Sequence, residues 1–218
     1  MTDLQTLVQR MLRADEAVIG RDDVEDALHL AALRYSEHRP RILVAEVDAP
    51  EGVILSLPAE WEVGFSRLTG AEREDVASTE VLDITRIQAE ETANGWRLRM
   101  ASPIPAGLLR LRFAVSHTVT ADINTLPERE WEAVATYAAA HLLEQLAVAK
   151  SGDTDPSFGG AAVNRSTPAQ AYADRAKTLR QHYQTLLGIV PGHTAPAGTA
   201  VYLGSARGQR LTVLGDAS

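Results

Sequence analysis

Four arginines in two short β-prone segments are the residues of this chain best suited to a specific chemistry. Arg97 and Arg99 occupy one segment, Arg110 and Arg112 occupy the other, and all four alternate with apolar residues. Alternate residues of a strand share a face, so the arginines of each segment project to one side. Guanidinium groups bind carboxylates and phosphates through paired N–H donors, which is a chemistry of recognition. Because like charges placed opposite each other destabilise a sheet, acidic partners are expected nearby.

The charge distribution leaves three partners open for these arginines. The net charge is -8; residues 44–95 hold 12 acidic against 3 basic residues, whereas residues 96–126 hold 4 arginines against 1 acidic residue. The arginines could pair with the acidic segment of the same chain, with that of a neighbouring copy, or with nucleic acid. The acidic total and the sparse aromatic residues disfavour nucleic acid, because tight binding depends on neutralising phosphates and on stacking.

An acidic run is the second group with a possible chemistry. Glu72, Glu74 and Asp75 lie close together, and Glu80 and Asp83 follow. The run lacks the ligand spacing and the turn glycine of a calcium loop, so a solvated loop is its simplest interpretation. If several copies formed a ring, the same carboxylates could instead face a central channel and repel passing phosphates.

No pattern of residues indicates catalysis, a cofactor or a metal. The glycines form no phosphate-binding motif, and the absence of cysteine excludes disulfides and thiolate sites, which fits a reducing cytoplasm. The histidines are scattered, and His141 on an apolar helical stripe is typical of a core or interface residue. The first residues lack the layout of a signal peptide, and no apolar run approaches about 18 residues. We therefore expect a protein that is neither an enzyme, nor secreted, nor membrane-spanning.

Four helices are predicted from apolar stripes at helical spacing and from capping residues. Their expected ranges are residues 2–20, 22–39, 125–151 and 167–187. Pro40 ends the second helix, since a residue that precedes proline is excluded from the α region. The fourth is the best defined, because Thr167 is a cap, Pro168 takes the first helical position and Gly188 follows the end.

Between the second and third helices the hydrophobic period changes from 3.6 to 2, which indicates strands. Strands are predicted at residues 41–47, 53–57, 81–87, 96–100 and 109–115. The turn-rich segment 102–107 lies between the last two, so these two are expected to pair as a hairpin or in a closely related way. The predicted strands form a small antiparallel sheet, as a sandwich or a partial barrel.

The end of the chain has a different composition. Residues 188–198 contain two prolines and three glycines, which is typical of an extended spacer. Two short β-prone runs follow, which could be a late strand pair of the chain's own sheet or an arm that contacts a partner; we favour the arm. Its apolar residues are Val201, Tyr202, Leu203, Leu211, Val213 and Leu214.

Three segments of the chain resemble the head-tail connector (adaptor) proteins of long-tailed bacteriophages. They are Ala32-Leu-Arg-Tyr-Ser-Glu-His-Arg-Pro-Arg41, Leu57-Pro-Ala-Glu-Trp-Glu-Val-Gly-Phe-Ser66 and Ala169-Gln-Ala-Tyr-Ala-Asp-Arg-Ala-Lys-Thr-Leu-Arg-Gln-His-Tyr183. The resemblance covers roughly residues 22–187, and none of its motifs is a catalytic signature. The chain departs from the family at residues 70–80, where an acidic run replaces an expected short apolar phrase that ends in Tyr-Pro.

The resemblance implies an α+β fold with a four-helix core. A small antiparallel β domain, residues 41–124, would be inserted between helices two and three. Residues 1–40 and 125–188 would supply the helices of the bundle. Residues 189–218 would form an extended C-terminal arm.

The resemblance also implies a structural virion protein, forming a ring that is expected to be twelvefold. The ring would join the portal to stopper or tail-terminator proteins and extend the DNA channel, with packaged DNA as passing cargo and no membrane contact. In it the four arginines would meet a neighbouring subunit, the acidic run would face the channel and the arm would dock on the portal. The expected location is the virion neck, after assembly in the host cytoplasm. The alternatives are another neck or tail-completion protein, a ligand-binding or enzymatic domain, and a nucleic-acid-binding accessory protein.

Overall fold

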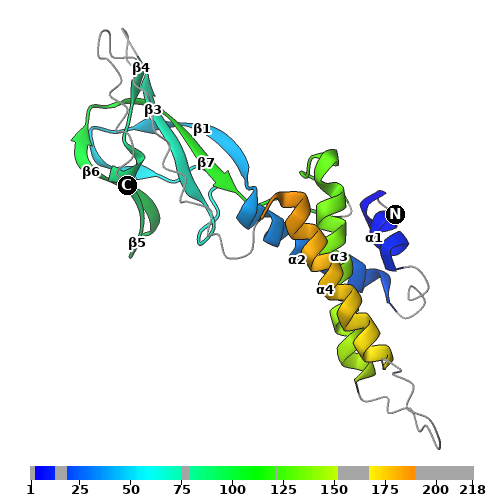
Figure 1. Ribbon diagram of the computed structural model, residues 1–218. Helices are drawn as coiled ribbons and strands as arrows, with labels where there is room; N and C mark the ends of the chain where they lie inside the picture. The colour runs from blue at the N-terminus through cyan, green and yellow to red at the C-terminus, as the bar shows by residue number, and fades with distance from the viewer. Residues whose placement is uncertain (1–2, 13–18, 75–78, 121, 152–166, 190–218) are drawn as a thin grey trace, which may run out of the picture.

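The computed structural model of the 218-residue chain describes residues 3–12, 19–74, 79–120, 122–151 and 167–189. Four α-helices lie at one end of the molecule in these ranges, and the β-strands lie at the other end (Figure 1). Within the described ranges, each end has its own cluster of buried apolar residues. The chain therefore has two cores, one made by helices and one by strands.

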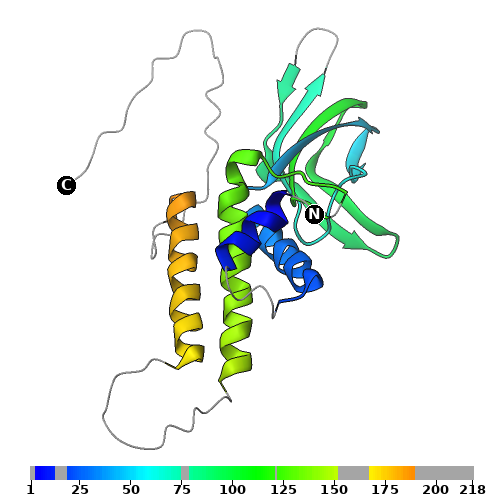
Figure 2. The same cartoon turned by 90° about the vertical axis from the view of Figure 1, so that its right-hand side faces the viewer.

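The helical end is organised around its third helix. The helices are α1 (Asp3–Leu12), α2 (Arg21–His38), α3 (Trp131–Lys150) and α4 (Pro168–Leu187). In Figure 2, α3 lies between α4 on one side and α1 and α2 on the other. Alanines occupy much of α3, and five of them are buried, which lets neighbouring helices approach it on several sides.

The predicted caps of α4 and the end of α2 are confirmed. The Thr167 hydroxyl accepts a hydrogen bond from the backbone N–H of Gln170 at 3.3 Å. Gly188 follows the helix with φ of 70°, a left-handed conformation that a residue without Cβ adopts most easily. The last residue of α2 is His38, so the helix stops before Pro40.

The strands form two antiparallel sheets. They are β1 (Arg41–Ala49), β2 (Gly52–Ser56), β3 (Arg67–Glu74), β4 (Thr79–Val81), β5 (Ile87–Thr92), β6 (Gly95–Ile104) and β7 (Gly107–Val115). The four-stranded sheet has the order β1-β7-β3-β4, and the three-stranded sheet has the order β2-β6-β5. Both sheets contribute to one apolar cluster, so their inner faces meet and their outer faces point in opposite directions.

A single bent ribbon connects the two sheets. Ala49 pairs with Gly107 at the end of the four-stranded sheet, and Gly52 pairs with Ile104 at the start of the three-stranded sheet. The ribbon of β1 with β7 therefore continues as the ribbon of β2 with β6. A register shift follows Gly52, whose φ of 140° is accessible to glycine but strained for other residues. Such irregularities bend strands, and here the bend folds the ribbon over the core.

The predicted small β domain inserted in a four-helix core is wrong. The β end consists of two sheets with a core of its own, which includes the fully buried side chains of Leu98, Leu109 and Leu111. Two strands that were not predicted, β3 and β5, complete the sheets. Both contain several charged residues, which weakens the alternation on which strand prediction depends.

The predicted hairpin of residues 96–100 with residues 109–115 is also wrong. The first segment lies in β6 and the second in β7, and these strands belong to different sheets. The short connection between Ile104 and Gly107 passes from one sheet to the other. The predicted strand at residues 81–87 is instead the end of β4, the short 3-10 helix Ile84–Arg86 and the first residue of β5.

Candidate functional site

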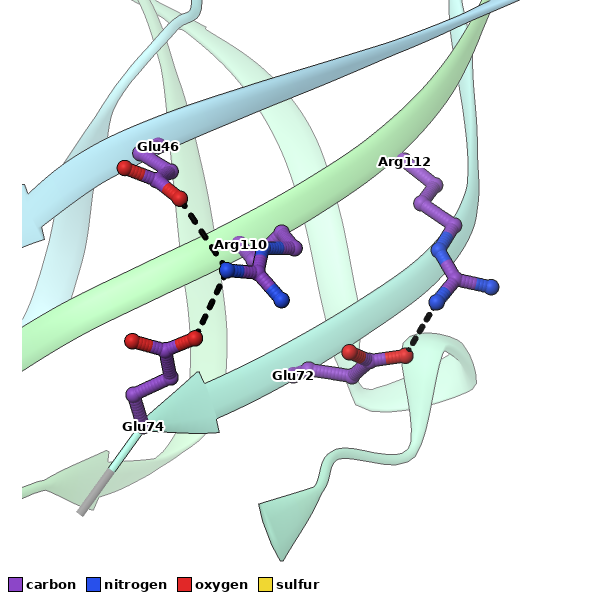
Figure 3. Close-up of polar contacts among 5 residues, drawn as sticks. All are labelled: Glu46, Glu72, Glu74, Arg110 and Arg112. Carbon is purple, nitrogen blue, oxygen red and sulfur yellow. Dashed lines mark hydrogen bonds and ion pairs between the residues drawn. The ribbon is translucent and has the colours of Figure 1, made fainter. Parts of the chain in front are cut away.

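The outer face of the four-stranded sheet carries a ladder of charged side chains, formed by Glu46, Glu72, Glu74, Arg110 and Arg112 (Figure 3). Arg110 on β7 lies between β1 and β3 and donates to Glu46 at 3.2 Å and to Glu74 at 2.7 Å. The hydrogen bond with Glu46 and the charge of Glu74 raise the pKa of Arg110. The guanidinium group thereby links three neighbouring strands.

Arg112 makes the second connection of this ladder. Its guanidinium donates to Glu72 at 2.6 Å, and the Glu72 side chain is only 19% exposed. In the register of the sheet Arg112 stands opposite Gly70, and Glu72 stands opposite Arg110, so the ion pair is diagonal. Diagonal neighbours on adjacent strands are within reach of long side chains.

The outer face of the three-stranded sheet has fewer carboxylates. Arg97 on β6 donates to Glu90 on β5 at 2.7 Å, and this hydrogen bond lowers the pKa of Glu90. Arg99 lies farther from the same carboxylate, at 3.5 Å, and its side chain is 61% exposed. Two guanidinium groups thus share one glutamate.

The structure therefore separates the four arginines that the sequence was expected to bring together. Arg110 and Arg112 lie on one outer face, while Arg97 and Arg99 lie on the other. Each of the four has a carboxylate of the same chain within ion-pair distance. An intersubunit role for them stays a prediction.

The acidic run is not the loop that the sequence suggested. Glu72 and Glu74 belong to β3, where each pairs with an arginine of β7. Asp75 lies outside the described residues, as do all the residues of the predicted portal-docking arm (Val201, Tyr202, Leu203, Leu211, Val213 and Leu214). The channel-facing role of the carboxylates stays a prediction.

A network of buried polar groups joins the two ends of the molecule, and we call it the junction. Ser36, fully buried in α2, donates through its hydroxyl to the carbonyl of Ala32 at 2.6 Å. The same hydroxyl accepts the backbone N–H of His117 at 2.7 Å. The His117 ring lies 5.3 Å from the ring of Tyr35. The end of α2 is thereby fixed to the segment that leaves β7.

The imidazole of His117 extends this network in two directions. Its Nδ1 lies 3.1 Å from the carbonyl of Thr125, and its Nε2 lies 3.2 Å from the carbonyl of Arg39. Burial lowers the pKa of His117, and the two carbonyls act in the opposite direction. A neutral ring donates one of these hydrogen bonds, whereas a charged ring would donate both.

An ion pair lies beside the imidazole. Arg39 donates to Glu130 at 2.7 Å, and Glu130 is only 8% exposed. A second nitrogen of Arg39 lies 3.4 Å from the carbonyl of Leu187, the last residue of α4. One side chain therefore contacts both the start of α3 and the end of α4.

The segment 57–66 packs against the same end of β7. The Trp61 ring lies 5.6 Å from that of Phe113. The carboxylate of Glu62 accepts the backbone N–H of Ser116 at 2.9 Å and its hydroxyl at 3.0 Å. Trp61 is thus a packing residue.

Helix α4 contacts the junction through an aromatic cluster. The hydroxyl of Tyr183 lies 3.1 Å from Nδ1 of His38, and its ring packs edge to face against Tyr137 at 5.0 Å. The guanidinium carbon of Arg180 lies 3.7 Å from the centroid of the Tyr137 ring. The same guanidinium donates two hydrogen bonds to the Glu144 carboxylate, at 2.9 and 2.7 Å. Burial raises the pKa of Tyr183.

Two cavities lie at the helical end. One, of about 270 Å³, is lined by Arg34, His38, Tyr137, Arg180, Tyr183, Gln184 and Ile189. Its two guanidinium groups are already paired, Arg34 with Glu37 and Arg180 with Glu144. The other, of about 220 Å³, is lined by Gln5, Glu25, Asp26, Leu28, His29, Val119 and Thr120. Both cavities are smaller than the roughly 300 to 1,000 Å³ that is typical of small-molecule sites.

The described ranges contain neither a cluster of metal-binding side chains nor a membrane-spanning helix. Among these residues, no cluster of three or more histidine, aspartate or glutamate side chains is arranged to hold a metal ion. None of the helices seen there combines the length and the apolar character needed to cross a bilayer.

No protein-family model matches the chain, and no curated protein matches it. Its function must therefore be inferred from its own residues.

Sequence reasoning missed most of the junction. His117, Glu130 and Glu62 were not singled out. Their partners are far away along the chain; His117 and Ser36, for example, are 81 residues apart. Contacts between such distant residues leave no local pattern in the sequence.

Proposed function

We propose that this chain is a structural subunit of the neck of a tailed phage or a prophage-like particle. In this proposal it is a head-tail connector: copies form a ring, expected to be twelvefold, between the portal and the stopper or tail-terminator proteins. The ring extends the DNA channel and helps to retain the packaged genome, and DNA is its passing cargo. The proposed role is mechanical, and no step of bond chemistry is assigned to it.

The observation that carries the proposal is the spatial convergence of the three segments that resemble connector proteins. The first contains Ser36 and Arg39, which contact His117 and Glu130. The second contains Trp61 and Glu62, which contact the end of β7 and Ser116. The third contains Tyr183, which contacts His38. Segments separated by up to about 150 residues thus surround one junction.

This convergence gives the resemblance a physical basis. Fold-determining residues of separate segments meet where the helical end joins the β end, and buried polar networks of this kind require a specific geometry. In the proposed role the subunit bridges portal and tail, so a firm junction between its two ends suits that work. The junction is held by hydrogen bonds of side chains as well as by apolar packing. Because hydrogen bonds are directional, they fix the orientation of the two ends.

Removal of the protein from the producing cell tests the proposal. Cells that lack it should accumulate DNA-containing or leaking heads and separate tails, because the two cannot be joined. A plasmid copy of the wild-type chain should restore complete particles. Negative-stain images and plaque counts measure both results, and normal infectious particles from the deleted strain would contradict the proposal.

The proposed portal contact has its own test. The segment 189–218 is the proposed portal-docking arm on the basis of its sequence. A chain truncated after Gly188 should keep its helical circular dichroism and its melting temperature but should no longer co-purify with the portal protein. If the truncated chain unfolds instead, these residues belong to the core and the arm is refuted.

A further inference from the structure

The two outer faces of the β end differ in charge. The face of the four-stranded sheet carries four carboxylates against three guanidinium groups: Glu46, Asp48, Glu72, Glu74, Arg67, Arg110 and Arg112. The face of the three-stranded sheet carries two guanidinium groups, Arg97 and Arg99, against the single carboxylate of Glu90. One face is therefore acidic and the other is basic.

Each face also has one charge that its own chain satisfies poorly. Asp48 is exposed on β1 and has no ion-pair partner among the residues that the structure describes. Arg99 is 61% exposed and lies 3.5 Å from a glutamate that binds Arg97 more closely. Asp48 and Arg99 are thus available to another molecule.

Apolar side chains accompany these charges. Ile42 and Val44 on β1 and Val81 on β4 are 48%, 57% and 51% exposed on the acidic face. Ile54 on β2 is 43% exposed, and its register with Arg99 places it on the basic face. Exposed apolar residues beside unsatisfied charges are typical of protein interfaces.

We propose that the acidic face of one copy of this chain binds the basic face of the next copy. The proposal rests on the ring of the proposed function and specifies its contact. Asp48 and its neighbouring carboxylates would receive Arg99, and Val44 would pack near Ile54 across the interface. The occupant is a second copy because the two faces complement each other in charge and belong to the same chain.

The symmetry of this contact follows from the fold. The two faces lie on opposite sides of one β core, so a contact between them is head-to-tail. Head-to-tail contacts produce either a closed ring or an open filament, whereas a face that binds itself produces a dimer. The position of the two faces therefore favours rings or filaments over two-fold dimers.

Cysteine cross-linking tests the contact directly, because the chain contains no cysteine. The full-length variants Val44→Cys, Ile54→Cys and Val44→Cys/Ile54→Cys are treated with a flexible bis-maleimide over a concentration series that reaches the solubility limit. The double variant should give a ladder of covalent oligomers on a denaturing gel, and each single variant should stay monomeric. Covalent dimers from either single variant would overturn the proposal, as would the absence of a ladder from the double variant.

Charge reversal tests the role of the two available charges. In the double-cysteine background, Asp48→Lys or Arg99→Glu should each lower the ladder yield by a few-fold, on the order expected for one exposed ion pair. The combination of both reversals should restore the yield, because lysine then faces glutamate. A combined variant weaker than either single reversal would overturn the proposal. The exposed residues Asp174 and Lys177 of α4 supply matched controls, Asp174→Lys and Lys177→Glu, which should leave the yield unchanged.

Co-purification with portal protein separates this inference from the proposed function. A chain that forms the ladder but does not bind portal refutes the neck assignment and supports the contact. A chain that binds portal but gives no ladder supports the neck assignment and refutes the contact. Cross-linking to DNA or to another protein in place of the ladder would likewise refute it.

Discussion

The junction and the outer faces of the sheets both consist of polar and charged residues, but they use them in opposite ways. At the junction, Ser36 is fully buried and Glu130 is 8% exposed, and each bonds a group from a distant segment. On the outer faces, the Glu74 and Arg99 side chains are 43% and 61% exposed. A lost partner is costly where water cannot replace it, so the junction supplies stability and the outer faces remain available for recognition.

The largest loss of stability is expected when the buried hydroxyl of Ser36 is removed from the junction. Ser36→Ala removes the acceptor of the His117 N–H and leaves that donor buried, which should lower the free energy of unfolding by about 1 to 3 kcal/mol. Urea denaturation measures the change. The control is Ser56→Ala on an exposed position of β2, where a change within about 0.5 kcal/mol is expected. Equal effects at the two serines would remove the distinction between junction and face.

A pair of glutamates sharpens the same comparison. Glu130→Gln weakens the ion pair with Arg39 inside the junction and should destabilise the protein by about 1.5 to 3 kcal/mol, the range for hydrogen bonds to charged groups. Glu74→Gln weakens the exposed pair with Arg110 and should cost no more than about 1 kcal/mol. Thermal and urea denaturation of both variants measure the difference. A larger loss for Glu74→Gln would reverse our assignment of the two regions.

Acidification should weaken the junction before it affects the carboxylates. Burial lowers the pKa of His117 and of His38, and the charge of Arg34 adds to the effect at His38. The unfolded chain therefore binds protons more readily than the folded one, and stability should decrease as the pH falls below about 6.5, the ordinary value for histidine. Each pKa unit of depression corresponds to about 1.4 kcal/mol.

Urea denaturation at pH 7.5 and at pH 5.5 measures this loss. His38→Asn should reduce the difference between the two pH values, because one of the two histidines with a lowered pKa no longer titrates. His29→Gln, at an exposed position of α2, is the control and should leave the difference unchanged. Stability that is equal at both pH values in the wild-type chain would contradict the role of the two histidines.

The helical end could be predicted from the sequence far better than the β end. Helix stripes and caps depend on residues within a few positions of one another, and the cap at Thr167 and the glycine at 188 were predicted correctly. The alternation of β6 and β7 correctly separated buried leucines from arginines, but alternation does not identify the neighbouring strand. The bend of the ribbon between Ile104 and Gly107 decides that the two strands enter different sheets.

The partners of the arginines were unpredictable for a related reason. The sequence indicated that acidic residues must lie near Arg110, and the acidic segment was identified. However, Glu46 and Glu74 approach Arg110 from both sides only because β7 lies between β1 and β3. Strand order is a property of the whole β core, whereas the need for a countercharge is a property of one residue.

The smallest effect on stability is expected for the ion pair of Arg112 with Glu72 in the charged ladder. This pair bears most directly on recognition by another molecule. The Arg112 side chain is 46% exposed and that of Glu72 is 19% exposed, so water and salt partly screen their 2.6 Å hydrogen bond. In a double-mutant cycle, Arg112→Gln and Glu72→Gln should show a coupling energy between about 0.2 and 1 kcal/mol that decreases in molar salt. Arg21→Gln and Glu25→Gln on α2 supply the matched exposed pair for the control cycle. A coupling energy of several kcal/mol at the ladder would make Arg112 a structural residue like Ser36. It would then be too firmly held to exchange partners with a neighbouring copy.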